Sequence, residues 1–121
     1  MVLRWNRSIN TTESTSNGWT GAKDALGDFS PGMVHYTDSV LFDEVWEREG
    51  LSPRDRSLVT VAALTAMGRT DQLRFHLTHA RSNGVSDDEL EEALLHLAFY
   101  AGWPSGMGAT ALLKEISEAE D

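Results

Sequence analysis

The chain has 121 residues, of which 40% are hydrophobic, and its formal net charge is −9 at pH 7. This length and hydrophobic content are typical of one globular domain and exclude a disordered polymer. The negative charge argues against a nucleic-acid partner, whose phosphates need a basic surface. Because the sequence has no cysteine, disulfides, thiolate nucleophiles and cysteine metal sites are excluded.

The first 32 residues predict an irregular N-terminal arm. Residues 8–20 are polar and lack a period, and Ser30-Pro31-Gly32 interrupts the chain again. One short helix is expected between them, at residues 22–26. Trp5 and Trp19 flank the polar segment, which suggests that this segment docks on a neighbour. The start of the chain lacks the apolar segment of a secretory signal, and no run approaches the roughly 20 apolar residues of a membrane span. We therefore expect a cytoplasmic protein without a membrane partner.

Residues 33–121 predict a single helical domain. A first helix is expected from about residue 33 or 37 to Glu49, with Gly50 as its stop. Its approximate apolar stripe consists of Val34, Tyr36, Val40, Leu41, Val45 and Trp46.

Four further helices are expected, and the first three of them have start signals in the sequence. Ser52-Pro53 opens the second helix, Thr70 is the expected N-cap of the third, and Ser86 with Glu89 forms a capping box for the fourth. The expected ends of these four helices are about Met67, Ser82, Ala101 and Ala119. The sequence therefore predicts an all-α fold, a bundle of about five to six helices.

Two of these helices carry more apolar surface than one small bundle needs. Residues 58–67 and 93–101 are apolar on nearly every face, and a helix of that kind is normally buried all round. One central helix can be covered in a domain of this size, whereas two are harder to cover. This excess predicts a homo-oligomer with helix-packed subunit contacts.

His76 and His79 lie three residues apart on one predicted helix, so both imidazoles lie near one face. A zinc site needs three or four ligands, so Glu92 and His96 would have to add ligands to these two histidines. The sequence contains neither HExxH nor the paired Glu-x-x-His pattern of di-iron bundles, and we expect no metal and no cofactor.

An acid–base role is the other interpretation of His76, because imidazole titrates near neutral pH. Gln72 lies one turn earlier and could orient the ring or a ligand, while a hydrogen-bonded core histidine is the plain structural alternative. Arg56 lies in the first turn of its helix, where a carboxylate ligand would meet both a guanidinium and the helix dipole. Its alternative is a surface ion pair with Asp55 or another acidic residue. For Trp103 the alternative to ligand binding is simple packing.

Four segments together resemble the carboxymuconolactone decarboxylase family. They are LSPRDRSLVTVAAL at 51–64, QLRFH at 72–76, ARSNGV at 80–85 and HLAFYAGWP at 96–104. The resemblance covers about residues 33–116. It implies an alkylhydroperoxidase-like (AhpD-like) helical fold that assembles into homo-trimers or homo-hexamers.

One branch of the family, the alkylhydroperoxidase-like branch, uses a Cys-x-x-Cys pair followed by a histidine. By spacing, that histidine corresponds to His76, and the two cysteines correspond to Arg69 and Gln72. The resemblance therefore places this chain in a cysteine-free branch, for which a thiol peroxidase activity is not expected.

The other branch implies decarboxylation of a small carboxylated lactone in aromatic-compound catabolism. By this resemblance His76 would be the proton donor and Arg56 the carboxylate anchor. The remaining candidate substrate-binding residues are Gln72, Trp103, His79 and His96. Two alternatives stay open at this point, namely a non-catalytic small-molecule-binding or scaffold protein with the same fold, and a metal-dependent enzyme.

Overall fold

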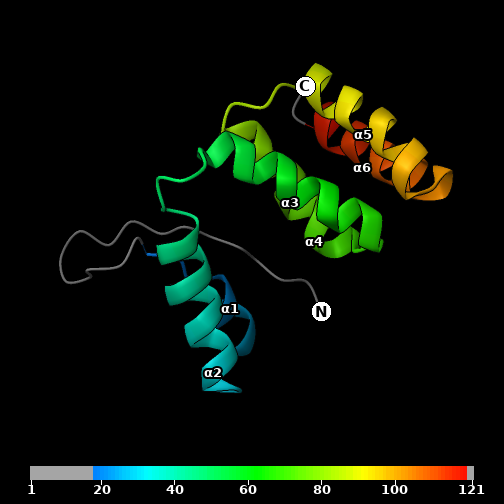
Figure 1. Cartoon of the computed structure of the whole chain (residues 1–121). Coiled ribbons are helices and arrows are strands. Elements are labelled where there is room, and N and C mark those ends of the chain that lie inside the picture. Colours follow the sequence, from blue (N-terminus) through cyan, green and yellow to red (C-terminus); the bar gives the residue numbers. More distant parts are fainter. Residues whose placement is uncertain (1–17, 120–121) are drawn as a thin grey trace. The chain divides into compact units, whose positions relative to one another are not determined.

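The computed structural model describes residues 18–119 of the chain. Most of the predicted N-terminal arm, residues 1–17, and the last two residues lie outside the described part. Residues 18–119 form helices joined by short turns and contain no strand, which confirms the predicted all-α class (Figure 1). The chain divides into two compact units, residues 1–50 and residues 51–121. None of the described helices is long and apolar enough to cross a membrane.

The described part of the first unit contains α1 (Gly21–Leu26), α2 (Pro31–Val34) and the π-helical segment η1 (His35–Val45). The short helix expected at 22–26 is therefore present as α1. The buried carboxylate of Asp38 accepts hydrogen bonds from the backbone N–H groups of Ala22 and Lys23, each at 2.9 Å. These N–H groups lie in the first turn of α1 and have no partner within the helix, so Asp38 of η1 caps α1.

The stripe predicted for residues 34–46 is correct at Trp46, which is buried, and wrong at Tyr36, Leu41 and Val45, which are exposed. Tyr36 is 65% exposed, whereas Asp38 and Phe42 are buried. The physical reason is the wider π-helical backbone, in which the Trp46 N–H donates to the carbonyl of Leu41, five residues back, at 2.9 Å. A stripe drawn with the α-helical period therefore misses the buried Asp38 and Phe42.

Trp19 packs within its own unit. Its ring stacks on Phe42 with centroids 4.3 Å apart, and Phe42 in turn stacks on Trp46 at 6.2 Å. All three aromatic side chains are buried. This ladder of rings, together with the capped start of α1, forms the interior of the described part of the first unit.

The second unit contains α3 (Pro53–Met67), α4 (Thr70–Ser82), α5 (Asp87–Ala101) and α6 (Trp103–Ala119). The hydroxyl of Ser52 accepts the N–H of Asp55 at 3.1 Å, and Ser86 and Glu89 form the expected capping box before α5. One predicted boundary differs by a residue. Arg69 is the N-cap of α4, and Thr70 is its first helical residue.

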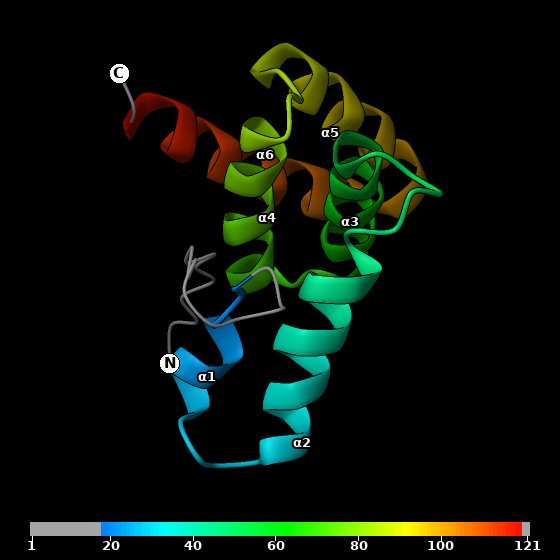
Figure 2. The same ribbon diagram turned by 90° about the vertical axis from the view of Figure 1, so that its left-hand side faces the viewer.

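The four helices of the second unit form two pairs. α3 packs against α4, and α5 packs against α6 (Figure 1). The pairs pack on each other through contacts of α3 with α5 and of α4 with α6, and Figure 2 shows α6 crossing α4. At the α5–α6 contact the helices lie very close, because a Cβ added to Gly106 would lie 2.5 Å from the Cβ of Ala98.

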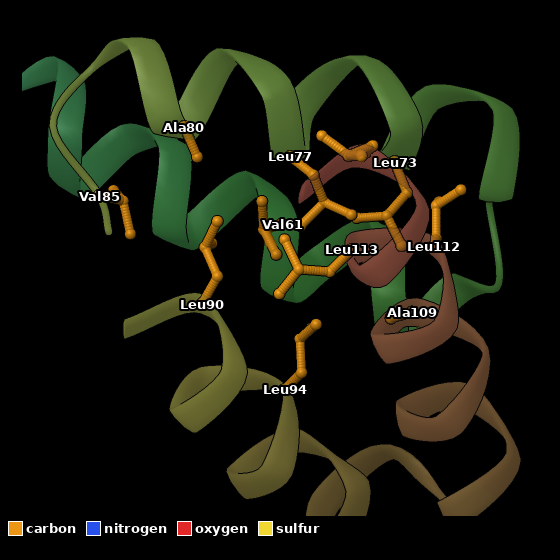
Figure 3. Packing of buried hydrophobic residues seen from close by; sticks show 11 residues of the cluster. Val61, Leu73, Leu77, Ala80, Val85, Leu90, Leu94, Ala109, Leu112 and Leu113 are labelled. Carbon is orange, nitrogen blue, oxygen red and sulfur yellow. The ribbon is translucent and has the colours of Figure 1, made fainter. Parts of the chain in front are cut away.

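The core of the second unit lies between these two pairs. Leu73 and Leu77 of α4 extend toward Leu112 and Leu113 of α6, and Val61 enters from α3 (Figure 3). The other members of the cluster are Ala80, Val85, Leu90, Leu94, Ala109 and Ile116. Other apolar side chains of these helices remain on the surface of the described chain, and Phe99 and Tyr100 are 75% and 80% exposed. The homo-oligomer that this surface predicts stays a prediction.

Candidate functional site

Helix α4 positions His76 beside the core. Leu73, Leu77 and Ala80 occupy the inner face of this helix and are buried. His76 precedes Leu77 and lies at the edge of the same face, so this residue is only 7% exposed. The Phe75 ring meets it edge-on with centroids 4.9 Å apart.

Burial controls the charge of His76. Desolvation, assisted by repulsion from His79, lowers its pKa from 6.5 to about 4. The imidazole is therefore neutral at pH 7 in the free protein. A neutral histidine in an acid–base site needs an anion beside it before it can hold a proton at that pH.

His79 and Phe75 complete a cluster of three rings on α4. The rings of His76 and His79 have centroids 6.2 Å apart, and Phe75 stacks on His79 at 5.3 Å with an interplanar angle of 18°. Phe75 therefore contacts both imidazoles, one through an edge-on contact and one face to face. Phe75 is not among the site residues predicted from the sequence, although its place beside His76 and four residues before His79 is the available signal.

Arg56 lies on α3, the helix that packs against α4. Its N–H donates to the carbonyl of Ser52 at 2.9 Å, and its carbonyl accepts the Thr60 hydroxyl at 2.8 Å, so its backbone is fixed in the first turn. The side chain is half-buried. The Asp55 carboxylate, considered above as an ion-pair partner of Arg56, lies 3.6 Å from the Arg54 guanidinium.

A buried polar contact next to Arg56 joins the start of α3 to the end of α4. The fully buried Ser57 hydroxyl donates to the carbonyl of Pro53 at 2.9 Å and accepts from the Asn83 side chain at 2.9 Å. Asn83 is the C-cap residue of α4. The sequence predicts the end of this helix at about Ser82 but not this contact, which depends on the tertiary packing.

Gln72 and Arg69 lie together at the start of α4. They line a polar hollow of about 260 Å³ with Gly68, Thr70 and Asp71. Gln72 is half-buried and lies one turn before His76 on the same helix. The structure thus places Gln72, His76 and His79 along α4, with Arg56 on the neighbouring helix.

His96 and Trp103 lie elsewhere in the described chain. The ring of His96 on α5 lies 4.8 Å from Tyr100, and the ring of Trp103 at the start of α6 meets Phe99 edge-on at 5.5 Å. Both side chains are exposed. Trp103 lines a separate hollow of about 310 Å³ between α5 and α6.

Within residues 18–119, no group of three or more His, Asp or Glu side chains converges in a way that could hold a metal ion. His76 and His79 therefore meet without a third such ligand from this part of the chain.

Comparison with known proteins shows which family this chain resembles in sequence. Residues 31–115 match the sequence profile of the Carboxymuconolactone decarboxylase family. The chain is 43% identical over 91 residues to a 4-carboxymuconolactone decarboxylase of Acinetobacter baylyi, covering 75% of this chain and 68% of that protein.

Two further relatives are similar over shorter shares of their length. A nitrosuccinic acid decarboxylase of Metarhizium robertsii is 41% identical over 78 residues, which are 64% of this chain and 54% of that protein. An uncharacterised 15.0 kDa protein of Paracoccus denitrificans is 28% identical over 82 residues, or 66% of this chain and 61% of that protein. On the profile match and the Acinetobacter relative, this chain belongs to the carboxymuconolactone decarboxylase family.

Proposed function

We propose that this protein is a decarboxylase of a small carboxylated substrate, with a carboxylated lactone as the first compound to test. The observation that carries the proposal is the buried imidazole of His76 on a helix packed against the Arg56 helix, in a chain 43% identical to a protein named 4-carboxymuconolactone decarboxylase. Two relatives are both named as decarboxylases, and their names give different acids as the substrate.

The proposed reaction needs only residues of the chain. The bond between the carboxylate carbon and its neighbour breaks, carbon dioxide leaves, and the bonding electron pair stays on the substrate. In an unsaturated lactone that pair delocalises toward the ring carbonyl, and in a nitro acid it delocalises into the nitro group. A proton from the His76 imidazolium then bonds to the electron-rich carbon, and the neutral imidazole regains a proton from solvent.

The lowered pKa of His76 determines how this donor is charged. At pH 7 the free imidazole is neutral, because its pKa is about 4. A substrate carboxylate bound nearby stabilises the imidazolium and raises that pKa, so substrate binding is accompanied by proton uptake. The donor is thereby protonated only when an anion occupies the site.

Arg56 supplies the carboxylate anchor in this proposal. A guanidinium in the first turn of α3 offers two parallel N–H donors to a carboxylate, and the helix dipole adds to the attraction. Gln72 and His79 lie on the His76 helix and are proposed to contact the rest of the substrate. His96 and Trp103, which lie on α5 and α6, are proposed to contribute where copies meet in a homo-trimer or homo-hexamer.

We place this activity in the cytoplasm and in the breakdown of aromatic compounds. We further propose that it needs no metal or organic cofactor. A non-catalytic binding or scaffold role is the alternative, and it predicts ligand binding without turnover.

The test is carbon dioxide release by the full chain from 4-carboxymuconolactone and from nitrosuccinic acid. We expect release well above the uncatalysed rate from at least one acid, and the same rate after dialysis against EDTA. Saturable binding of both acids without release would favour the scaffold alternative. Loss of release on dialysis that returns with a divalent metal would overturn the cofactor-free mechanism.

A further inference from the structure

The side chain of Asn83 connects the end of α4 to the first turn of α3, the turn that carries Arg56. Its amide nitrogen donates a hydrogen bond to the Ser57 hydroxyl at 2.9 Å. That hydroxyl donates in turn to the carbonyl of Pro53 at 2.9 Å, and Ser57 is fully buried. Because Arg56 lies between Pro53 and Ser57 in the chain, these two bonds hold the backbone turn from which its side chain extends.

The direction of these hydrogen bonds determines what each position must supply. The Ser57 hydroxyl has one proton, which it gives to Pro53, so its oxygen can only accept from a second partner. An amide N–H of Asn83 meets that need. The contact therefore requires a donor at position 83 and a hydroxyl at position 57, and an alanine at either position removes it.

The backbone around Asn83 is itself fixed by hydrogen bonds and by the core. The Asn83 N–H donates to the carbonyls of His79 and Ala80, at 3.0 and 3.1 Å, and so closes the last turn of α4. Gly84 then takes a φ of +96°, and the N–H of Val85 donates to the Ala80 carbonyl at 3.0 Å. Val85 is buried in the core cluster. The Asn83 amide is therefore presented to α3 from a rigid part of the second unit.

An exposed ion pair also reaches the start of α3, from α5. Arg54 pairs with Glu89, and their side chains are 37% and 46% exposed. A pair exposed to this degree contributes little, because water screens it. The Asn83 bond ends on a fully buried hydroxyl, where the loss of a partner costs more. We therefore expect Asn83, and not Glu89, to set the position of this turn.

His76 and Asn83 lie seven residues apart on α4, which is about two helical turns, so they share one face of this helix. The contact with Ser57 thus sets the Arg56 turn against the face of α4 that carries His76. We propose that Asn83 is a positioning residue, which holds the Arg56 guanidinium in register with His76 by fixing the first turn of α3 through Ser57. Because Arg56 is the carboxylate anchor only in the function proposed above, this role of Asn83 rests on that proposal.

Asn83→Ala in the full chain tests this role. We expect KM for the acid that the wild type decarboxylates to rise about five-fold, with a smaller change in kcat, because a displaced anchor weakens carboxylate binding. Ser57→Ala removes the same contact from the other helix and should raise KM by a similar factor. Urea unfolding verifies that each variant is folded.

Binding of succinate measures the same effect without turnover. Succinate has the carbon skeleton of nitrosuccinic acid and lacks the nitro group that would accept the electron pair, so it should bind without reacting. Its Kd, measured by calorimetry, should also rise about five-fold in Asn83→Ala.

The double variant Arg56→Gln with Asn83→Ala distinguishes positioning from a general loss of structure. If Asn83 acts through Arg56, its substitution should change KM less than about two-fold once the guanidinium is absent. Ser82→Ala is a local control, because the exposed Ser82 hydroxyl bonds to Thr78 within α4. Ile116→Val is a control for stability, because it removes a methyl group from the core far along α6. Both controls should keep the wild-type KM.

Three results in an active wild type would overturn the role of Asn83 and leave the proposed function in place. They are an unchanged KM in Asn83→Ala, an equal rise in Ile116→Val, and a full five-fold effect of Asn83→Ala in the Arg56→Gln background. A wild type that releases no carbon dioxide from either acid would contradict the proposed function, and the succinate Kd would then decide the role of Asn83 by the same three comparisons. A wild type that also fails to bind succinate would contradict both.

Discussion

The rings of His76 and His79 meet edge-on, with centroids 6.2 Å apart and an interplanar angle of 78°. Burial of His76, with repulsion from its neighbour, lowers its pKa to about 4. Because His76 has this lowered pKa, both the stability of the fold and the proposed turnover should depend on pH. These two pH dependences can be measured separately.

The first prediction concerns stability. In the unfolded chain His76 takes up a proton near its ordinary pKa of 6.5, whereas in the folded chain it does so only near 4. The unfolded state therefore binds more protons between these two values, and stability falls as the pH falls through this window. For this group alone, the loss between pH 7 and pH 4 is about 3 kcal/mol.

Urea unfolding of the wild type and of His76→Gln at pH 7 and at pH 4.5 measures this contribution. The variant should lose less stability than the wild type over the same interval. His35→Gln, which changes an exposed histidine of η1, is the control and should behave as the wild type does. An identical pH dependence in all three proteins would rule out a buried neutral His76.

The second prediction concerns the pH dependence of turnover. If His76 donates its proton as an imidazolium, kcat/KM follows the free protein and should decline as the pH rises above about 4. The kcat value follows the complex, in which the substrate carboxylate raises the His76 pKa, so its decline should begin at a higher pH. Steady-state rates from pH 4 to pH 9 give both profiles. Coinciding declines would contradict proton uptake on binding.

The third prediction separates two arginines of one helix. Arg56→Gln should raise KM about 10- to 100-fold with a smaller change in kcat, because a charge-assisted contact to the substrate carboxylate is lost. Arg54→Gln is the matched control, since Arg54 pairs with Asp55 and Glu89 on the surface. Its KM should change less than about two-fold. Equal increases in KM for both variants would indicate a general effect of charge and would remove Arg56 as the anchor.

The fourth prediction uses two glycines of α6. A Cβ at Gly106 would lie 2.5 Å from the Ala98 Cβ and 3.3 Å from the Leu94 carbonyl, whereas a Cβ at Gly108 meets no atom within 4 Å. Gly106→Ala should therefore destabilise the protein by about 1–2 kcal/mol. Gly108→Ala should stabilise it by about 0.5–1 kcal/mol, because alanine favours the helix.

Chemical denaturation of both alanine variants measures whether the free energy of unfolding falls in Gly106→Ala and rises in Gly108→Ala. Because the substitutions are the same and lie two residues apart, helix propensity largely cancels and the close α5–α6 contact remains. Equal stability changes would show that the helices do not approach as closely as the structure has them.

The helices of the second unit could be predicted because their ends are encoded locally. Ser52 and Ser86 cap their helices through bonds to residues three positions later, so sequence alone identifies both starts. The π-helical η1 could not be predicted in this way. Its five-residue hydrogen bonding has no residue-level signature, and the burial of Asp38 depends on the start of α1, which lies 16 residues away in sequence.

The candidate site was predictable in part for the same reason. His76 and His79 share a face because they belong to one helix, which the spacing already indicates. The contacts of Phe75 with the two imidazoles also lie within this helix, four residues or fewer apart. The contact of Ser57 with Asn83 depends instead on packing between two helices. The hydroxyl of Thr65, which has no hydrogen-bond partner within residues 18–119, is likewise a property of the folded core, because the sequence around it resembles any apolar helix.

The most direct test of the central proposal is the rate of carbon dioxide release from 4-carboxymuconolactone by the wild type, by His76→Gln and by His35→Gln. The account predicts turnover by the wild type, a loss of at least about 100-fold in His76→Gln, and an unchanged rate in His35→Gln. Circular dichroism of each variant verifies that the helices are intact. Wild-type turnover that persists undiminished in a folded His76→Gln protein would contradict His76 as the proton donor.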